Sequence, residues 1–142
     1  MKESIKCILI DNHDSFVYNL YRYLDEILPG QVRVMKNDEV DFGQLSLAQM
    51  IIISPGPDLP EKSGRTMEVI KLFNERIPIL GICLGHQCII EYYGGKLFRL
   101  ENVCHGVVSE VEIIDKSDVL YKNVGSPFKA GRYHSWVAST DF

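Results

Sequence analysis

The chain has 142 residues, of which 46% are hydrophobic and 24% are charged, and this composition is typical of a single globular domain. Its formal net charge of -4 provides no basic surface, and no apolar run approaches the ~20 residues that cross a bilayer, so we expect no nucleic-acid or membrane partner. Charged residues also interrupt the beginning of the chain, where a signal peptide carries its apolar segment, and this predicts a cytoplasmic protein.

The first elements are predicted from a switch between strand-like and helix-like spacing of the apolar residues. Residues 7–10 are expected to form a strand, and Asp14 or Ser15 to cap the helix that follows. The apolar face of that helix is expected to consist of Phe16, Leu20, Tyr23, Leu24, Ile27 and Leu28. Pro29 and Gly30 should end the helix, and residues 32–35 are predicted to form a second strand.

Two further apolar runs, residues 50–53 and 79–82, are too short for helices and resemble buried strands of a parallel sheet. A helix is predicted after each run. The second helix spans residues 84–93 and ends at Gly94 and Gly95, and the first carries an apolar stripe of Met67, Val69, Ile70, Leu72 and Phe73. The order β-α-β-β-α-β-α predicts an α/β fold with an open, mainly parallel sheet flanked by helices.

The pattern changes after residue 96. Residues 107–114 alternate apolar and polar side chains, which predicts a half-exposed antiparallel strand, and residues 132–137 are predicted to form a strand or a strand-edge loop. Because no linker or change of composition divides the chain, we expect one domain over residues 1–142. No helix terminates this domain, so we expect it to lack its C-terminal part.

The cysteines are Cys7, Cys83, Cys88 and Cys104, and their spacing matches neither a disulfide framework nor a structural zinc site. We therefore expect no metal. Three of these thiols are expected to be small buried hydrophobes. Cys83 is the exception, because its sequence neighbours suggest a chemical role.

Cys83 lies between Gly81 and Gly85, where a predicted strand passes directly into a predicted helix. This is the pattern of a nucleophile elbow, with cysteine in place of serine. The helix N-terminus favours the thiolate, and the Leu84 N–H can donate to an oxyanion that forms on a substrate carbonyl. The alternative is a glycine-rich turn that contains an inert cysteine.

A proline-rich loop at residues 54–60 follows the other buried strand, so we expect it at the same edge of the sheet as Cys83. Its prolines fix the shape of the loop and lack N–H groups, whereas Gly56 keeps its donor and permits a close approach. Gly56 is therefore a candidate for a second oxyanion donor. A plain turn and a phosphate-binding loop are the alternatives, and the prolines disfavour the latter.

The chain resembles the class I (triad-type) glutamine amidotransferases, most of all the small subunits of anthranilate synthase and aminodeoxychorismate synthase. The resemblance lies in five segments, which are residues 9–20, 54–57, 81–87, 104–106 and 132–136. The resemblance implies a flavodoxin-like fold and a glutaminase that needs no cofactor. This enzyme would hydrolyse L-glutamine and deliver the ammonia to a chorismate-using synthase large subunit. It implies that Cys83 is the nucleophile and that Gly56 and Leu84 hold the oxyanion. The glutamine contacts that it implies are Gly56, Pro57, Asp58, Gln87, Ser135 and Trp136.

The chain departs from the family pattern in two respects. Family members usually carry a small residue where Asp58 stands. Their general base belongs to a His-x-Glu pair, and none of the four histidines here begins one, so we expect that pair to lie beyond residue 142 and this chain to be inactive alone.

We expect His86 to pack against the core, His134 to belong to the substrate side, and His13 and His105 to have no carboxylate partner. Two rival functions remain at this point. One is a docking module that binds a synthase partner without hydrolysing glutamine. The other, a flavodoxin-like nucleotide binder, is disfavoured because the turn at residues 11–15 is acidic.

Overall fold

The computed structural model describes residues 5–139 and divides the chain into two compact units. The first, here called the α/β unit, comprises Met1–Leu97 and Ala138–Phe142, and the second, the hairpin unit, comprises Phe98–Val137. The expectation of one domain that lacks its C-terminal part stays a prediction.

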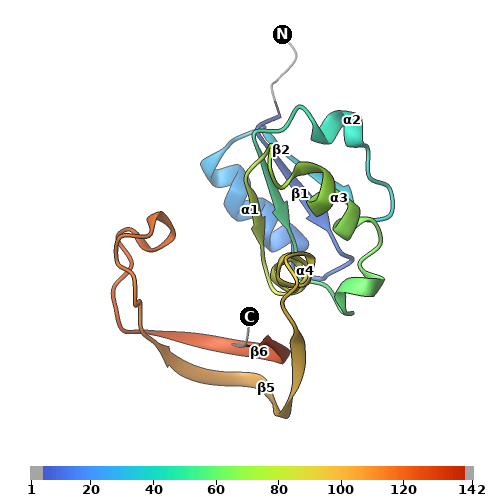
Figure 1. Cartoon of the computed structure of the whole chain (residues 1–142). Helices are drawn as coiled ribbons and strands as arrows, with labels where there is room; N and C mark the ends of the chain where they lie inside the picture. Colours follow the sequence, from blue (N-terminus) through green and yellow to red (C-terminus); the bar gives the residue numbers. More distant parts are fainter. Residues whose placement is uncertain (1–4, 140–142) are drawn as a thin grey trace. The chain divides into compact units, whose positions relative to one another are not determined.

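The α/β unit is built on a four-stranded sheet in the order β2-β1-β3-β4 (Figure 1). Its strands are β1 (Cys7–Asp11), β2 (Val32–Lys36), β3 (Met50–Ile53) and β4 (Ile79–Gly81). Each neighbouring pair is parallel, so all four carboxyl ends lie at one edge. The predicted open parallel sheet is confirmed.

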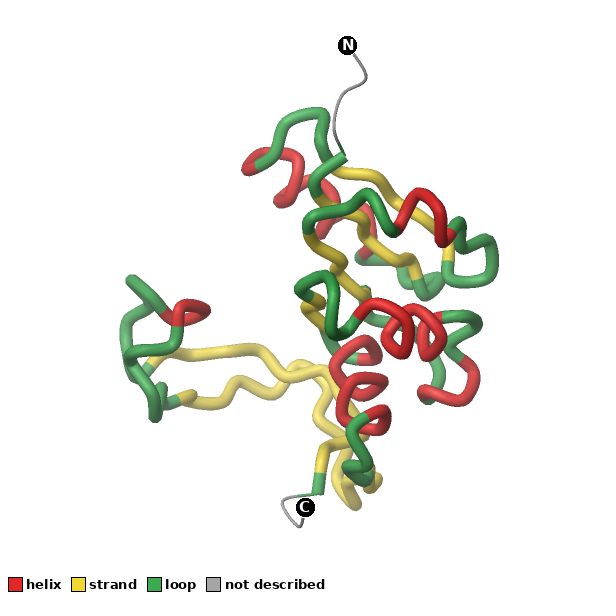
Figure 2. The backbone as a smooth tube through the Cα atoms, turned by 45° about the horizontal axis from the view of Figure 1, so that its top comes forward, coloured by secondary structure: helices red, strands yellow, loops and turns green. Residues whose placement is uncertain are grey.

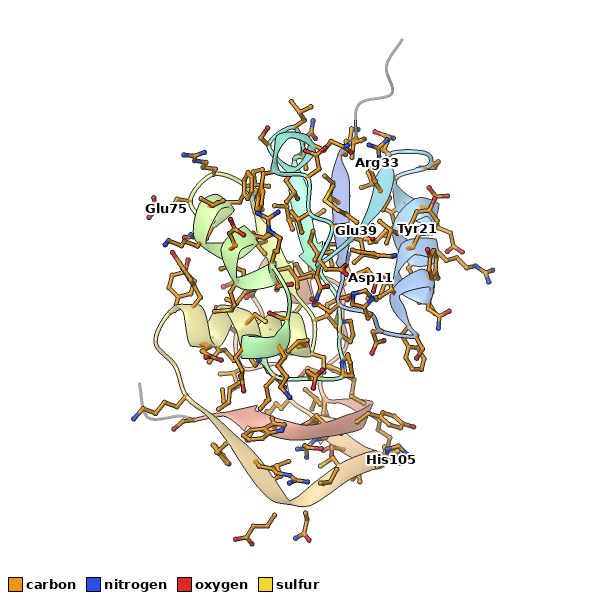
Figure 3. The ribbon with its side chains drawn as sticks, turned by 90° about the vertical axis from the view of Figure 1, so that its right-hand side faces the viewer. Asp11, Tyr21, Arg33, Glu39, Glu75 and His105 are labelled. Carbon is orange, nitrogen blue, oxygen red and sulfur yellow. The ribbon has the colours of Figure 1, made fainter. Side chains whose placement is uncertain are left out.

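Helices cover both faces of this sheet. Helix α1 (Val17–Ile27) packs on one face, over Cys7, Leu9 and Ile52. Helices α2 (Phe42–Leu45), α3 (Thr66–Phe73) and α4 (Leu84–Tyr92) pack on the other. Figure 3 shows the two sides by Tyr21 on α1 and Glu75 just after α3. None of the helices within residues 5–139 is long and apolar enough to cross a membrane.

The start and the buried face of α1 differ from the prediction. Phe16 is the N-cap residue and no side chain caps the helix, because the Asp14 carboxylate accepts from the N–H of Phe16 and not from an N–H within the helix. The face that packs on the sheet is made by Val17, Leu20, Tyr21, Leu24 and Leu28, and the expected members Phe16, Tyr23 and Ile27 are exposed. The buried stripe begins at Val17, which places those three residues to one side of it.

Two smaller expectations are also corrected, and two short helices are added. Leu72 of α3 is exposed. Strand β4 is not a fully buried strand, because it lies at the edge of the described sheet and its Leu80 is partly exposed. The structure adds α2 and a short 3-10 helix, η1 (Pro60–Lys62), which the apolar pattern did not predict. Helix α2 begins where the Asp41 carboxylate accepts from the Gln44 N–H, a polar signal that apolar spacing does not contain.

Two long antiparallel strands, β5 (Leu97–Val111) and β6 (Phe128–Ala138), form the hairpin unit except for their terminal residues Leu97 and Ala138, which belong to the α/β unit. The hairpin unit also contains a 3-10 helix, η2 (Val119–Tyr121) (Figure 2). The antiparallel prediction is confirmed, but β5 begins well before residue 107 and ends at Val111. Its early half shows no strict alternation and is a strand because it pairs with β6. The predicted alternation holds from Ser109 to Ile114.

Candidate active site

Cys83 occupies the sharp turn between β4 and α4. Its backbone has φ 51° and ψ -106°, in the left-handed half of conformational space that non-glycine residues rarely adopt. Such a conformation costs of order 1–3 kcal/mol and persists only where the surrounding structure enforces it. The residue is exposed, whereas Leu84 and Gly85 behind it are buried. The turn therefore presents the sulfur outward, as the elbow prediction requires.

The two glycines of the elbow are required by close backbone contacts. A Cβ atom at Gly81 would lie 2.4 Å from the carbonyl carbon of Gly85, and a Cβ at Gly85 would lie 2.4 Å from the carbonyl oxygen of Ile53. Neither neighbour is a flexible side chain that can move aside. The elbow is thus packed against the end of β3 at distances that only glycine allows.

The ionisation of Cys83 differs from the expectation. Desolvation by the surrounding protein raises the pKa of Cys83, the hydrogen bond from the Leu84 N–H lowers it, and the negative charge of Asp14 raises it, with a net upward shift. The expected bias toward thiolate is wrong, because the donor at the helix N-terminus does not outweigh desolvation. The sulfur therefore needs a proton acceptor before it can attack a substrate.

The other thiols lie in different surroundings. Cys7 and Cys88 are buried, and burial raises the pKa of each to about 11. Cys104 is half-buried on β5, so the expectation of three buried thiols holds for two of them. Among the described cysteines Cys83 is the exposed one.

The proline-rich loop touches the elbow. A Cβ atom at Gly56 would lie 2.4 Å from Cδ2 of Leu84, so the Gly56 backbone and the Leu84 side chain are in direct contact. Parallel pairing of β3 with β4 sets Ile53 opposite Gly81, and the two following loops leave the sheet side by side. Within residues 5–139 no hydrogen bond engages the Gly56 N–H. The structure thus brings together the two residues predicted to donate to an oxyanion.

A buried polar cluster, which the sequence analysis missed, lies beside the loop. Asn12 donates from its backbone N–H to Ser54 Oγ and from Nδ2 to the Ser54 carbonyl oxygen, both at 2.9 Å. Its Oδ1 accepts from Thr66 Oγ1 at 2.7 Å and from Asn37 Nδ2 at 3.0 Å. The positions of these residues in the sequence could have indicated the cluster, because three of them directly follow β1, β2 and β3 and the fourth begins α3.

The predicted glutamine contacts of the α/β unit lie on the same loop and helix. Pro57 and Asp58 are exposed, and the Asp58 carboxylate is 4.0 Å from Lys62 Nζ. Gln87 is buried in the first turn of α4, and its N–H donates to the Cys83 carbonyl oxygen at 3.0 Å. The contacts of these residues with glutamine stay predictions.

Ser135 and Trp136 lie on β6, in the hairpin unit, and their contacts with glutamine also stay predictions. His134 stands beside them with both ring nitrogens engaged: Nε2 accepts from Arg132 Nε at 3.0 Å, which leaves the proton on Nδ1, 3.3 Å from the Trp136 carbonyl oxygen. Both ring nitrogens of His134 thus have partners within the hairpin unit.

The other histidines correct two expectations. His86 does not pack against the core but is exposed on the first turn of α4, because the buried face of that turn is formed by Leu84, Gly85 and Gln87. His13, at φ 61°, has a carboxylate partner after all, since Nε2 lies 3.3 Å from Asp38 Oδ1. His105 lies on β5 (Figure 3), with its ring against Tyr133 at 5.4 Å between centroids. Among the described residues, no three His, Cys, Asp or Glu side chains are grouped to hold a metal ion.

Comparisons with known proteins agree with this geometry. Residues 8–142 match the family model described as "Glutamine amidotransferase class-I". Aminodeoxychorismate/anthranilate synthase component 2 of Bacillus subtilis (strain 168) is 38% identical over 136 residues, which cover 94% of this chain and 69% of that protein. Bifunctional protein TrpGD of Thermotoga maritima is 39% identical over 135 residues, which cover 93% of this chain but only 23% of that protein.

A solved structure shares the fold. A glutamine amidotransferase from Thermotoga maritima superimposes with a TM-score of 0.75 and 15% sequence identity, covering 96% of this chain and 63% of that one. This likeness supports the arrangement of the strands and helices and carries no statement about substrate.

Proposed function

Since the chain belongs to the class I glutamine amidotransferase family, we propose that it is the glutaminase part of a chorismate-using synthase. In this role it hydrolyses L-glutamine to glutamate and ammonia, and a synthase large subunit uses the ammonia. The name of the Bacillus subtilis relative supports such a partner and includes both the aminodeoxychorismate and the anthranilate reactions, so the likeness does not separate the two pathways.

The observation that carries this proposal is that Cys83 is exposed at a strained turn. The proline-rich loop, whose Gly56 N–H has no hydrogen-bond partner within the described residues, contacts Leu84 of the same turn. Positive φ at a non-glycine residue, enforced by two glycines that tolerate no Cβ, costs folding energy that a cysteine of purely structural role does not need. A module that only docks a partner has no use for this turn either. The geometry therefore favours catalysis over docking alone.

The chemistry follows from the arrangement of donors. The Cys83 sulfur gives its proton to a general base and attacks the side-chain carboxamide of glutamine, forming a carbon–sulfur bond. The tetrahedral oxyanion accepts hydrogen bonds from the N–H groups of Gly56 and Leu84. The carbon–nitrogen bond then breaks, the nitrogen takes up a proton and leaves as ammonia, and water hydrolyses the γ-glutamyl thioester to glutamate.

We propose that these 142 residues do not include the general base. None of its four histidines begins a His-x-Glu pair, and His134 has both nitrogens engaged. We expect the 142 residues alone not to turn over glutamine, although they contain the proposed nucleophile and the two proposed donors. Cytoplasmic location stays a prediction.

Covalent labelling tests the proposal without requiring turnover. A glutamine analogue with a chloromethyl ketone in place of the carboxamide is attacked by the nucleophile, which displaces chloride and forms a thioether. Mass spectrometry of the labelled chain and its peptides should show one adduct on Cys83, and L-glutamine should protect it. Unselective labelling of the accessible thiols, or labelling that glutamine does not slow, contradicts the proposal.

A further inference from the structure

The proline-rich loop has few backbone groups with which to hold itself in place. Pro55 and Pro57 have no N–H, and the N–H of Gly56 between them is not bonded within the described residues. The Ser54 N–H donates to the Ile10 carbonyl oxygen at 3.0 Å, which fixes only the start of the loop. The position of Gly56 must therefore be held by side chains or by packing.

Asn12 supplies both kinds of contact. It binds the hydroxyl and the carbonyl oxygen of Ser54, two residues before Gly56. It also packs directly on Gly56, where an added Cβ would lie 2.8 Å from Cβ of Asn12 and 3.1 Å from its carbonyl oxygen. Gly56 is thus in close contact with both Asn12 and Leu84.

The orientation of the Asn12 amide is itself fixed. Its oxygen accepts from two donors, Thr66 Oγ1 and Asn37 Nδ2, so its NH₂ group must be the one that faces the Ser54 carbonyl oxygen. All four residues are at most 5% exposed, and no buried side-chain nitrogen or oxygen among the described residues lacks a partner. A fully bonded buried network of this kind holds one geometry, because any rotation leaves a polar group unpaired.

We propose that Asn12 is a positioning residue for the oxyanion site, which holds the Ser54–Gly56 segment so that the Gly56 N–H stays in register with that of Leu84. This inference rests on the proposed function. Asn12 does not touch the substrate and acts through Ser54 and Gly56. Loosening its contacts lowers the reactivity of Cys83 toward reagents whose carbonyl oxygen is held in the oxyanion site, and leaves its reactivity toward a small alkylating reagent unchanged.

The test compares two reagents on the same thiol. The ketone oxygen of the glutamine analogue takes the place of the carboxamide oxygen, so the oxyanion donors orient and polarise it while the thiol displaces chloride from the adjacent carbon, whereas the small reagent iodoacetamide is not held in the glutamine site. The ratio of the two rate constants at Cys83 reports on the oxyanion site, and it cancels changes in exposure or in the pKa of the thiol. A purely structural role of Asn12 does not move this ratio.

Two serines provide a matched pair of variants. Ser54 and Ser63 are both almost fully buried, and each hydroxyl donates to a carbonyl oxygen of its own loop, at 2.7 Å and 2.6 Å. Ser54→Ala removes the acceptor of the Asn12 N–H and should lower the ratio by about tenfold, less than the ~10²–10³ typical for loss of a whole donor. Ser63→Ala should leave it within about twofold of the wild type.

Asn12→Asp is the second variant, because it keeps the shape and the acceptor for Thr66 and Asn37 but replaces the donor to Ser54 by an oxygen. It should lower the ratio at least as far as Ser54→Ala does. Unchanged ratios in both variants, or equal losses in Ser54→Ala and Ser63→Ala, overturn the inference alone. A wild-type chain that the ketone does not label at Cys83 overturns the proposed function, and this inference with it.

Discussion

The two units of the chain bury their apolar side chains to very different extents. In the α/β unit Ile8, Ile10, Ile51 and Ile53 of neighbouring parallel strands are completely buried. In the hairpin unit Ile113 is the one apolar residue in the buried set of the described chain, and its neighbour Ile114 is 98% exposed. One unit has helices packed on both faces of its sheet around a buried core, and the other is a pair of strands whose side chains are exposed or half-buried.

This difference indicates where stability and chemistry reside. A two-stranded hairpin is marginally stable on its own, whereas a sheet covered by helices on both faces supplies its own apolar core. Cys83, Gly56 and Asn12 all belong to the α/β unit, on loops that leave one edge of its sheet. Substitutions there should therefore affect both stability and reactivity more than matched substitutions in the hairpin unit.

The largest expected contrast concerns the thiols. Cys83→Ser should abolish labelling by the chloromethyl ketone analogue and leave the far-ultraviolet circular dichroism unchanged, because the side chain is exposed. Cys104→Ser makes the same change on β5 of the hairpin unit and should keep the labelling. Peptide mapping by mass spectrometry measures both, and persistent labelling of the Cys83→Ser chain at another residue would refute the assignment of the nucleophile.

The next largest contrast between the two units is expected when an apolar side chain is truncated to alanine in each. Ile51→Ala deletes fully buried methyl groups in β3 and should lower the free energy of unfolding by about 2–5 kcal/mol. The same change at Ile114, which is almost fully exposed, should alter it by less than about 0.5 kcal/mol. Urea denaturation provides the measurement. Similar losses at both sites would mean that the hairpin unit is buried in solution.

A single added methyl group gives a smaller contrast. Gly85→Ala forces a Cβ to within 2.4 Å of the Ile53 carbonyl oxygen and should cost about 1–3 kcal/mol of unfolding free energy. At Gly125 of the hairpin unit an added Cβ meets no atom within 4 Å, so Gly125→Ala should be close to neutral. If thermal unfolding shows Gly85→Ala to be as stable as the wild type, the elbow is not packed as described.

The smallest expected effect is on the ionisation of Cys83. Because the thiolate is the nucleophile and the pKa of Cys83 is raised, the rate of alkylation by iodoacetamide should keep rising with pH beyond the range of an ordinary thiol. Asp14→Asn removes a negative charge that raises this pKa, so the whole curve should move to lower pH. Asp38→Asn, which removes a carboxylate paired with His13, serves as the control. A shift to higher pH in Asp14→Asn contradicts the account.

The sequence predicted the α/β unit well because its signals are local. Short apolar runs predicted the parallel strands, and the spacing of Gly81, Cys83 and Gly85 predicted the turn. What it missed depends on contacts between distant residues. The Asn12 cluster joins positions up to 54 residues apart, and the raised pKa of Cys83 comes from surroundings that no sequence window contains.

The exposed side of α1 and the early half of β5 were mispredicted for a related reason. Apolar spacing alone does not distinguish Phe16 and Tyr23 from the adjacent stripe that packs on the sheet. The early half of β5 is a strand by virtue of its partner β6, which lies beyond any local pattern.

The central claim is that Cys83, Gly56 and Leu84 form one site that receives the glutamine carboxamide. A crystal structure of the chain after reaction with the chloromethyl ketone analogue tests it most directly. We expect a covalent bond to Cys83 Sγ, and the ketone-derived oxygen about 2.7–3.1 Å from the backbone nitrogens of both Gly56 and Leu84. An adduct whose oxygen faces solvent, or lies away from the proline-rich loop, would contradict the account.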